Sequence, residues 1–260
     1  MKYLWLVMLP ALLLMQNSNA ETAEEKGLNI AREANQRDLG WQDNQSVMRM
    51  VLRNRQGAES IRQIRSRALE VTGDGDKTLI VFESPLDVKG TSFLTHSHAR
   101  QADDQWLFLP ALRRVKRIGS ANKSGPFMGS EFAYEDISSQ ELDKYTYKYI
   151  RDEKIDGRDT FVTEQYPQYE HSGYTRQVVW IDKQMYQPLK TEFYDRKNTL
   201  LKTLTFHDYK QYLGKYWRAH RLEMLNQQTG KSTTLTFSEF KFKNGFSNRD
   251  FDHNSLKRAR

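Results

Sequence analysis

The chain has 260 residues, with 40 Lys and Arg residues against 33 Asp and Glu residues, which gives a formal net charge of +7. It contains no Cys, which excludes a disulfide framework, a thiolate zinc site, a Cys nucleophile and a lipid-anchored N-terminal Cys. Hydrophobic residues make up 38% of the chain, more than a disordered chain shows, so a folded core is expected. The modest positive charge is compatible with an anionic partner but does not require one.

The first twenty residues have the pattern of a secretory signal peptide. Lys2 gives a positive start, Leu4 to Met15 form an apolar run, and Ser18-Asn19-Ala20 supply small residues before an acidic stretch. We therefore expect cleavage after Ala20 and a periplasmic mature protein, residues 21–260, that forms a single domain. An uncleaved N-terminal anchor is the alternative, although the run is short for a membrane span. Export argues against a nucleic-acid partner.

The mature chain is expected to begin with one helix. Thr22 and Glu25 have the spacing of a capping box, in which each side chain accepts a hydrogen bond from a free backbone N–H at the helix start. Small or apolar residues then recur every three to four positions: Gly27, Ile30, Ala31 and Ala34. Because this face is narrow and made largely of small residues, we expect the helix to pack closely against a sheet.

From Ser46 onward the pattern changes to an alternation with a period of two, which is typical of strands. Turn signals such as Asp156-Gly157 and Ser172-Gly173 separate the later strands. Long strands joined by tight loops predict an antiparallel meander. We expect an α+β, mostly β chain of about eleven strands curled into an incomplete barrel. The N-terminal helix and short helices would plug its concave face and leave a cavity.

Apolar alternation and the loop described below supply the candidate residues for a cavity and its flap. They are Met48, Met50, Leu52, Trp106, Phe108, Phe127, Met128 and Phe132. Met is adaptable and suits a cavity for flexible apolar ligands, but it also fills ordinary cores. A one-residue error in register would exchange the inward and outward faces.

Residues 103–137 depart from the meander. Four bases follow one another on a short strand: Arg113, Arg114, Lys116 and Arg117. The next loop, Gly119–Gly129, still carries Phe127 and Met128. In one interpretation this loop is a mobile flap at a cavity mouth, and the basic strand contacts an anionic head group or a membrane. In the other, the loop folds back and buries Phe127 and Met128, while the four bases form a solvated face.

The runs WLFLPALRRVKRI (Trp106–Ile118) and GPFMGSEFAYED (Gly125–Asp136) resemble a bacterial family of outer-membrane lipoprotein-sorting proteins. This family lies in the superfamily of the lipoprotein carrier LolA, its receptor LolB and the regulator RseB. The resemblance covers nearly all of the mature chain. It implies an incomplete antiparallel barrel whose helices plug an apolar cavity, and the handling of lipid or lipoprotein acyl chains. It also implies an inner-membrane RND or MMPL-type transporter and an outer-membrane acceptor as partners.

Catalytic chemistry is not indicated by the motifs. His96 and His98 have the spacing of a metal-binding pair, but no well-placed third ligand accompanies them. The paired acids Asp103-Asp104 and Glu135-Asp136 are interpreted as turn or cap residues, because neighbouring acids on a strand point to opposite faces. The sequence holds no G-x-S-x-G, H-E-x-x-H or Walker motif. We therefore expect neither an enzyme nor a metal or cofactor.

Two other binding functions remain open at this point. One is an RseB-like regulatory or protein-binding module of the envelope without transport activity. The other is a binder of surface polysaccharide or peptidoglycan that uses exposed aromatic residues such as Trp41, Trp180 and Trp217.

Overall fold

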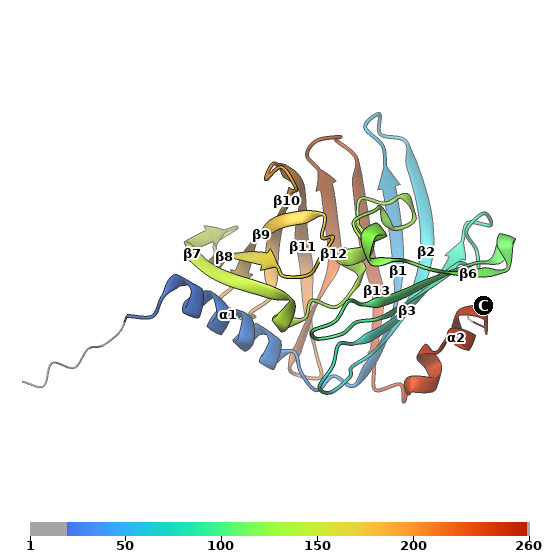
Figure 1. Ribbon diagram of the computed structural model, residues 1–260, viewed down its shortest axis with the longest axis horizontal. Coiled ribbons are helices and arrows are strands. Elements are labelled where there is room, and N and C mark those ends of the chain that lie inside the picture. Colours follow the sequence, from blue (N-terminus) through green and yellow to red (C-terminus); the bar gives the residue numbers. More distant parts are fainter. Residues whose placement is uncertain (1–19, 259–260) are drawn as a thin grey trace, which may run out of the picture.

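The computed structural model describes residues 20–258 (Figure 1), so all of the predicted signal peptide except Ala20 lies outside the described residues. The strands form one antiparallel sheet in the order β6-β5-β4-β3-β2-β1-β13-β12-β11-β10-β9-β8-β7. The first six are β1 (Asp43–Arg53), β2 (Glu59–Leu69), β3 (Lys77–Ser84), β4 (Ser92–His96), β5 (Asp104–Leu109) and β6 (Arg114–Arg117). The other seven are β7 (Tyr145–Ile155), β8 (Arg158–Pro167), β9 (Tyr174–Asp182), β10 (Pro188–Asp195), β11 (Leu200–Tyr212), β12 (Tyr216–Asn226) and β13 (Ser232–Phe242).

The sheet consists of two meanders that meet where β1 pairs with β13. Met50 of β1 lies opposite Leu235 of β13 on one side and Arg62 of β2 on the other. The sheet curls without closing, and β6 and β7 are its two edges (Figure 1). The predicted curled, mostly β fold is therefore confirmed. It has thirteen strands where about eleven were expected.

Each face of the sheet buries its own apolar cluster. The concave face carries the main core, which includes Met48, Met50, Ile64, Phe82, Phe93, Leu204, Met224 and Leu235. On the convex face, Leu79 and Leu94 pack against Phe251 of the 3₁₀ turn η6 (Asn248–Phe251) and Leu256 of α2 (His253–Arg258). No helix within residues 20–258 is long and apolar enough to cross a membrane.

The N-terminal helix α1 (Ala23–Arg37) lies beneath the β7 end of the sheet (Figure 1). Its predicted capping box is present: the Glu25 N–H donates to Thr22 Oγ1 at 3.1 Å, and the Thr22 N–H donates to Glu25 Oε2 at 2.8 Å. The predicted close packing is also present. A Cβ at Gly27 would lie 2.7 Å from the Tyr149 backbone N of β7, so the helix and the strand touch backbone to backbone.

The chain between the two edge strands, residues 118–144, crosses the concave face, and we name it the plug. It contains four 3₁₀ turns, η2 (Ser120–Asn122), η3 (Phe127–Gly129), η4 (Tyr134–Ile137) and η5 (Leu142–Lys144). Phe127 is 1% exposed, and its ring centroid lies 5.1 Å from that of Phe93 and 6.0 Å from that of Phe82. The plug therefore fills the half of the concave face formed by β1–β5.

Replacing Gly27 by Ala tests this close contact. Gly to Ala in an open helix stabilises by about 1 kcal/mol, but here the added methyl group has no room. We expect Gly27→Ala to lower the free energy of unfolding by about 2 kcal/mol, as overpacking does, measured by urea denaturation. Gly119→Ala is the control, since its Cβ would lie 3.8 Å from the Asn122 side chain. A stabilised Gly27→Ala protein would contradict the backbone contact.

Candidate functional site

The half of the concave face that the plug leaves free holds a cavity of about 1140 Å³. It is bounded by the end of α1, the loop to β1, the turn between β2 and β3, and residues 138–143 of the plug. Its apolar floor comes from the inward side chains of β9 to β12: Val179, Ile181, Phe193, Leu204, Phe206 and Leu222. Phe206 and Leu222 are only half-buried, so they present apolar surface to the cavity.

The polar lining of this cavity is acidic. Eight carboxylates contribute to it: Asp38, Glu70, Asp74, Asp76, Glu135, Asp136, Glu141 and Asp143. None of its described lining residues is Lys or Arg. We name this space the acidic cavity.

Four of the eight carboxylates have a basic partner outside the lining. Asp38 Oδ1 lies 2.6 Å from Arg218 Nη1, and Asp143 Oδ2 lies 2.9 Å from Arg100 Nε. The other two pairs are Asp74 with His98 and Asp136 with Lys202. Within residues 20–258, no ion pair joins the remaining four, which are Glu70, Asp76, Glu135 and Glu141.

Two of these four carboxylates accept hydrogen bonds that hold neighbouring loops in place. Glu70 accepts hydrogen bonds from the Gly40 N–H at 2.6 Å and the Gln42 N–H at 2.7 Å, which fixes the loop between α1 and β1. Glu135 accepts from the Gly173 N–H, the Ser172 hydroxyl and the Tyr169 hydroxyl. Burial raises the pKa of Glu135, and the neighbouring charge of Asp136 adds to this rise.

Asp76 is the most perturbed carboxyl group of the acidic cavity. Burial, with smaller contributions from Glu141, Glu70 and Asp38, raises the pKa of Asp76 to about 7. The Val71 N–H donates to Asp76 Oδ1 at 3.1 Å and opposes this rise. Burial likewise raises the pKa of Asp38, although Arg218 opposes the change. Carboxylates from four separate segments are thus close enough to repel one another.

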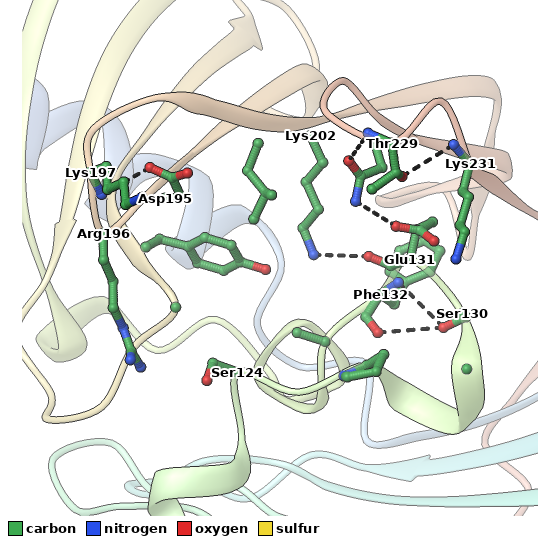
Figure 2. Close-up of a pocket in the computed structure, with 17 residues that line it drawn as sticks. Ser124, Ser130, Glu131, Phe132, Asp195, Arg196, Lys197, Lys202, Thr229 and Lys231 are labelled. Atoms are coloured by element: carbon green, nitrogen blue, oxygen red, sulfur yellow. Dashed lines mark hydrogen bonds between the residues drawn. The ribbon is translucent and has the colours of Figure 1, made fainter. Parts of the chain in front are cut away.

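A second pocket, of about 700 Å³, opens between the plug and the hairpin loops at the ends of β9 to β13 (Figure 2). Figure 2 shows Arg196 and Lys197 on one side of it and Lys231 on the other, with Lys202 between them. Its acidic lining residues are Glu131 and Asp195. Because bases outnumber acids here, we name it the basic pocket.

A buried charged group separates the two spaces. Lys202 of β11 donates to the Glu131 carbonyl at 3.0 Å (Figure 2) and to Asp136 Oδ2 at 2.6 Å. The Tyr174 hydroxyl donates to Asp136 Oδ1 at 2.8 Å. The side chains of Lys202 and Asp136 are 4% and 7% exposed. Phe132 and Tyr174 line both spaces, so the acidic cavity and the basic pocket adjoin at this group.

The residues assigned from the sequence to a cavity and flap fall into three places. Met48, Met50 and Phe127 are buried in the main core, and Leu52 and Met128 pack against it. Phe132 lines both the acidic cavity and the basic pocket. Trp106 and Phe108 belong to the convex cluster with Phe251 and Leu256, so the structure does not bring them to the concave face. Of the two interpretations of the loop that carries Phe127 and Met128, the structure agrees with the one in which the loop folds back onto the core.

The four predicted bases lie at the edge of the sheet and line neither space. Arg113 follows the 3₁₀ turn η1 (Pro110–Leu112) in a left-handed conformation, with φ of 48°. Arg114, Lys116 and Arg117 are exposed on β6, and Arg117 pairs with Asp104.

The predicted histidine pair is held by other contacts. His96 Nε2 lies 2.7 Å from the Phe251 carbonyl oxygen, and His98 Nδ1 lies 2.8 Å from Asp74 Oδ2. Within residues 20–258, no group of three or more His, Asp or Glu side chains is arranged to hold a metal ion. Of the three Trp residues named for the polysaccharide-binding alternative, Trp41 and Trp180 are buried, and Trp217 is partly buried.

The sequence analysis identified neither the acidic residues that line the acidic cavity nor the basic residues that line the basic pocket. Glu135 and Asp136 were interpreted from the sequence only as turn or cap residues. Asp136 does accept from the Ala133 N–H at 2.6 Å, as a cap does, and it also faces Lys202. No local pattern marks these acids, because the segments that carry them meet only in the folded chain.

Comparison with known proteins agrees with this architecture. A family model described only as "-like: Uncharacterized protein" matches residues 74–258. None of the curated proteins matches the chain. Among solved structures, an outer membrane lipoprotein-sorting protein domain from Vibrio parahaemolyticus is 60% identical, with a TM-score of 0.89 over 90% of this chain and 99% of that one.

Two further structures extend the comparison. A DUF1329 family protein from Desulfovibrio piger is 30% identical, with a TM-score of 0.86 over 90% of this chain and 99% of that one. A LolA superfamily protein from Nitrosomonas europaea is 21% identical, with a TM-score of 0.71 over 91% of this chain and 100% of that one, which shows a shared fold. The chain therefore belongs to the outer-membrane lipoprotein-sorting protein family.

Proposed function

We propose that this protein is a periplasmic carrier or chaperone that shields a lipid or lipoprotein acyl chain in the acidic cavity. The observation that carries the proposal is the apolar floor of a cavity of about 1140 Å³, which matches or exceeds the usual size of ligand pockets. Burying each CH₂ group contributes about 0.8 kcal/mol, so a twelve-carbon chain gives roughly 10 kcal/mol of gross transfer energy. This gross energy would favour retention of an acyl chain, and the entropy lost on binding opposes it.

The setting of this carrier is proposed from the sequence pattern and from the family resemblance. The signal-peptide pattern supports a periplasmic location. The family resemblance supports an inner-membrane RND or MMPL-type transporter as the donor or recipient, and an outer-membrane acceptor at the other end. Apolar burial supplies the driving force for uptake, and release would need a partner that offers a better site.

The alternative is a regulatory or protein-binding module of the envelope. The edge strand β6 favours it, since an edge presents backbone groups to which a partner strand can pair. The presence or absence of a shielded ligand separates the two functions, because a carrier must hold the tail inside the cavity.

Filling the cavity tests the carrier function. We expect the mature protein to bind the neutral probe N-phenyl-1-naphthylamine with a rise in fluorescence, and Leu222→Trp to weaken this binding at least tenfold. The indole ring would occupy the space above the apolar floor. Leu225→Trp is the matched control, because Leu225 lies on the same strand, is 43% exposed and is not part of the cavity lining.

Native mass spectrometry of the protein purified from periplasm supplies the second measurement. A stoichiometric lipid or acylated peptide would support the carrier. A ligand-free protein that takes up neither the probe nor added lipid would overturn it and favour the protein-binding alternative. Thermal melts of both Trp variants show whether a loss of binding is a loss of fold.

We also propose that the basic edge strand contacts an anionic membrane surface. Leu112 is 62% exposed beside Arg113 and Arg114, and Leu86 in the loop after β3 is 87% exposed. This loop lies next to η1, since a Cβ at Gly90 would be 3.3 Å from Pro110 Cγ. Exposed leucines among bases suit a surface that inserts shallowly between anionic head groups.

Removing two bases tests this contact. Each Lys or Arg near an anionic surface contributes about 1 kcal/mol, so Arg114→Gln with Lys116→Gln should weaken sedimentation with phosphatidylglycerol vesicles about thirtyfold. Vesicles of phosphatidylcholine alone should bind poorly in every case. Lys154→Gln with Lys241→Gln, at exposed positions on other strands, should leave binding nearly unchanged. An equal loss for both double variants would attribute binding to net charge and not to this edge.

A further inference from the structure

Four carboxylates that line the acidic cavity come from segments that are far apart in the sequence, and we name the part of the cavity that they line its mouth. Asp38 follows α1, Glu70 follows β2, Asp76 ends the turn before β3, and Glu141 lies in the plug. Among them only Asp38 has an ion pair within residues 20–258, with Arg218. At least two uncompensated negative charges therefore face the same space.

Such an arrangement disfavours the unliganded protein. Like charges that share a partly buried site repel one another, and burial removes the water that would screen them. The raised pKa of Asp76, to about 7, is the expected response to this environment. A positive charge placed among these carboxylates would relieve the repulsion, whereas an anionic head group would add to it.

The arrangement does not suit a bare metal ion. No group of three or more acidic or His side chains in the described chain is positioned to hold one. The same cavity is lined by aromatic rings, among them Trp41, Tyr145, Tyr147 and Tyr186, and aromatic faces attract organic ammonium groups. Carboxylates at moderate distance, aromatic rings and an apolar floor together fit an organic cation that carries an apolar tail.

We propose that the acidic cavity selects an amphiphile whose head group is positively charged, such as an alkyl amine, over one with an anionic head. This inference rests on the proposed carrier function and adds the chemical class of the ligand. It assigns Asp76 and Glu141 the role of attracting the head group, and Phe206 and Leu222 the role of contacting the tail.

The test compares three twelve-carbon ligands that differ only in the charge of the head group. Dodecylamine, dodecanol and dodecanoate, kept below their micellar concentrations at pH 8, compete against N-phenyl-1-naphthylamine. At this pH the amine is protonated and the carboxylate is ionised. We expect dodecylamine to bind at least tenfold more tightly than dodecanoate, with dodecanol between them.

Neutralising the mouth should remove this preference. Asp76→Asn with Glu141→Gln keeps side chains of similar shape, and each retains an acceptor oxygen for the Val71 N–H or the Ser139 hydroxyl. We expect the amine-to-carboxylate preference to fall to about threefold or less, while dodecanol binding stays the same. Glu170→Gln with Glu239→Gln removes two exposed charges elsewhere and should leave the preference intact.

The outcomes separate this inference from the function on which it rests. Equal binding of all three ligands, or a preference for dodecanoate, would overturn the charge selection and leave the carrier standing. Failure of the wild-type protein to bind the neutral probe and all three ligands would overturn both. If the double variant did not fold, the preference of the wild-type protein and its loss in Asp76→Asn alone would decide the question.

Discussion

An antiparallel sheet that curls without closing has to keep one concave apolar face away from water, and the rest of this structure follows from that constraint. The chain leaves the sheet at one edge, β6, and re-enters it at the other, β7, and the connecting segment crosses the concave side. That crossing is the plug, whose Phe127 is buried against Phe82 and Phe93. It covers one half of the face, and α1 covers only part of the other. The uncovered remainder is the acidic cavity.

The two spaces on the concave side differ in the charge of their lining residues. The acidic cavity and the basic pocket lie on either side of Lys202 and Asp136, which neutralise each other in a buried ion pair. Removing one partner of such a pair leaves an uncompensated buried charge, which typically destabilises by 3–5 kcal/mol. The pair therefore anchors the plug to β11 and also forms part of the boundary between two spaces of opposite sign. An amphiphile that enters from either side meets a different electrostatic environment.

In the proposed carrier, the strands supply the apolar floor, and the residues at the cavity mouth supply selectivity. A shared fold does not by itself fix a ligand, and apolar burial discriminates weakly between tails of similar length. Head-group charge acts more sharply, because Asp76 and Glu141 lie in a partly buried space where screening by water is reduced. Selectivity in this carrier would then come from loops outside the sheet, whereas retention would come from the strands.

The sequence alone determined the features that depend on neighbouring residues. The capping box of Thr22 and Glu25, the small helix face at Gly27, the alternating strands and the turns between them are local patterns, and all of them are present in the structure. Only the tertiary structure decided that Trp106 and Phe108 face the convex side and that Phe127 is buried. The acidic cavity was equally invisible, because Asp38, Glu70, Asp76 and Glu141 come together only when separate segments pack. Periodicity in the sequence indicates which side chains share a face of a strand. Strand register and long-range packing decide which other segments contact that face.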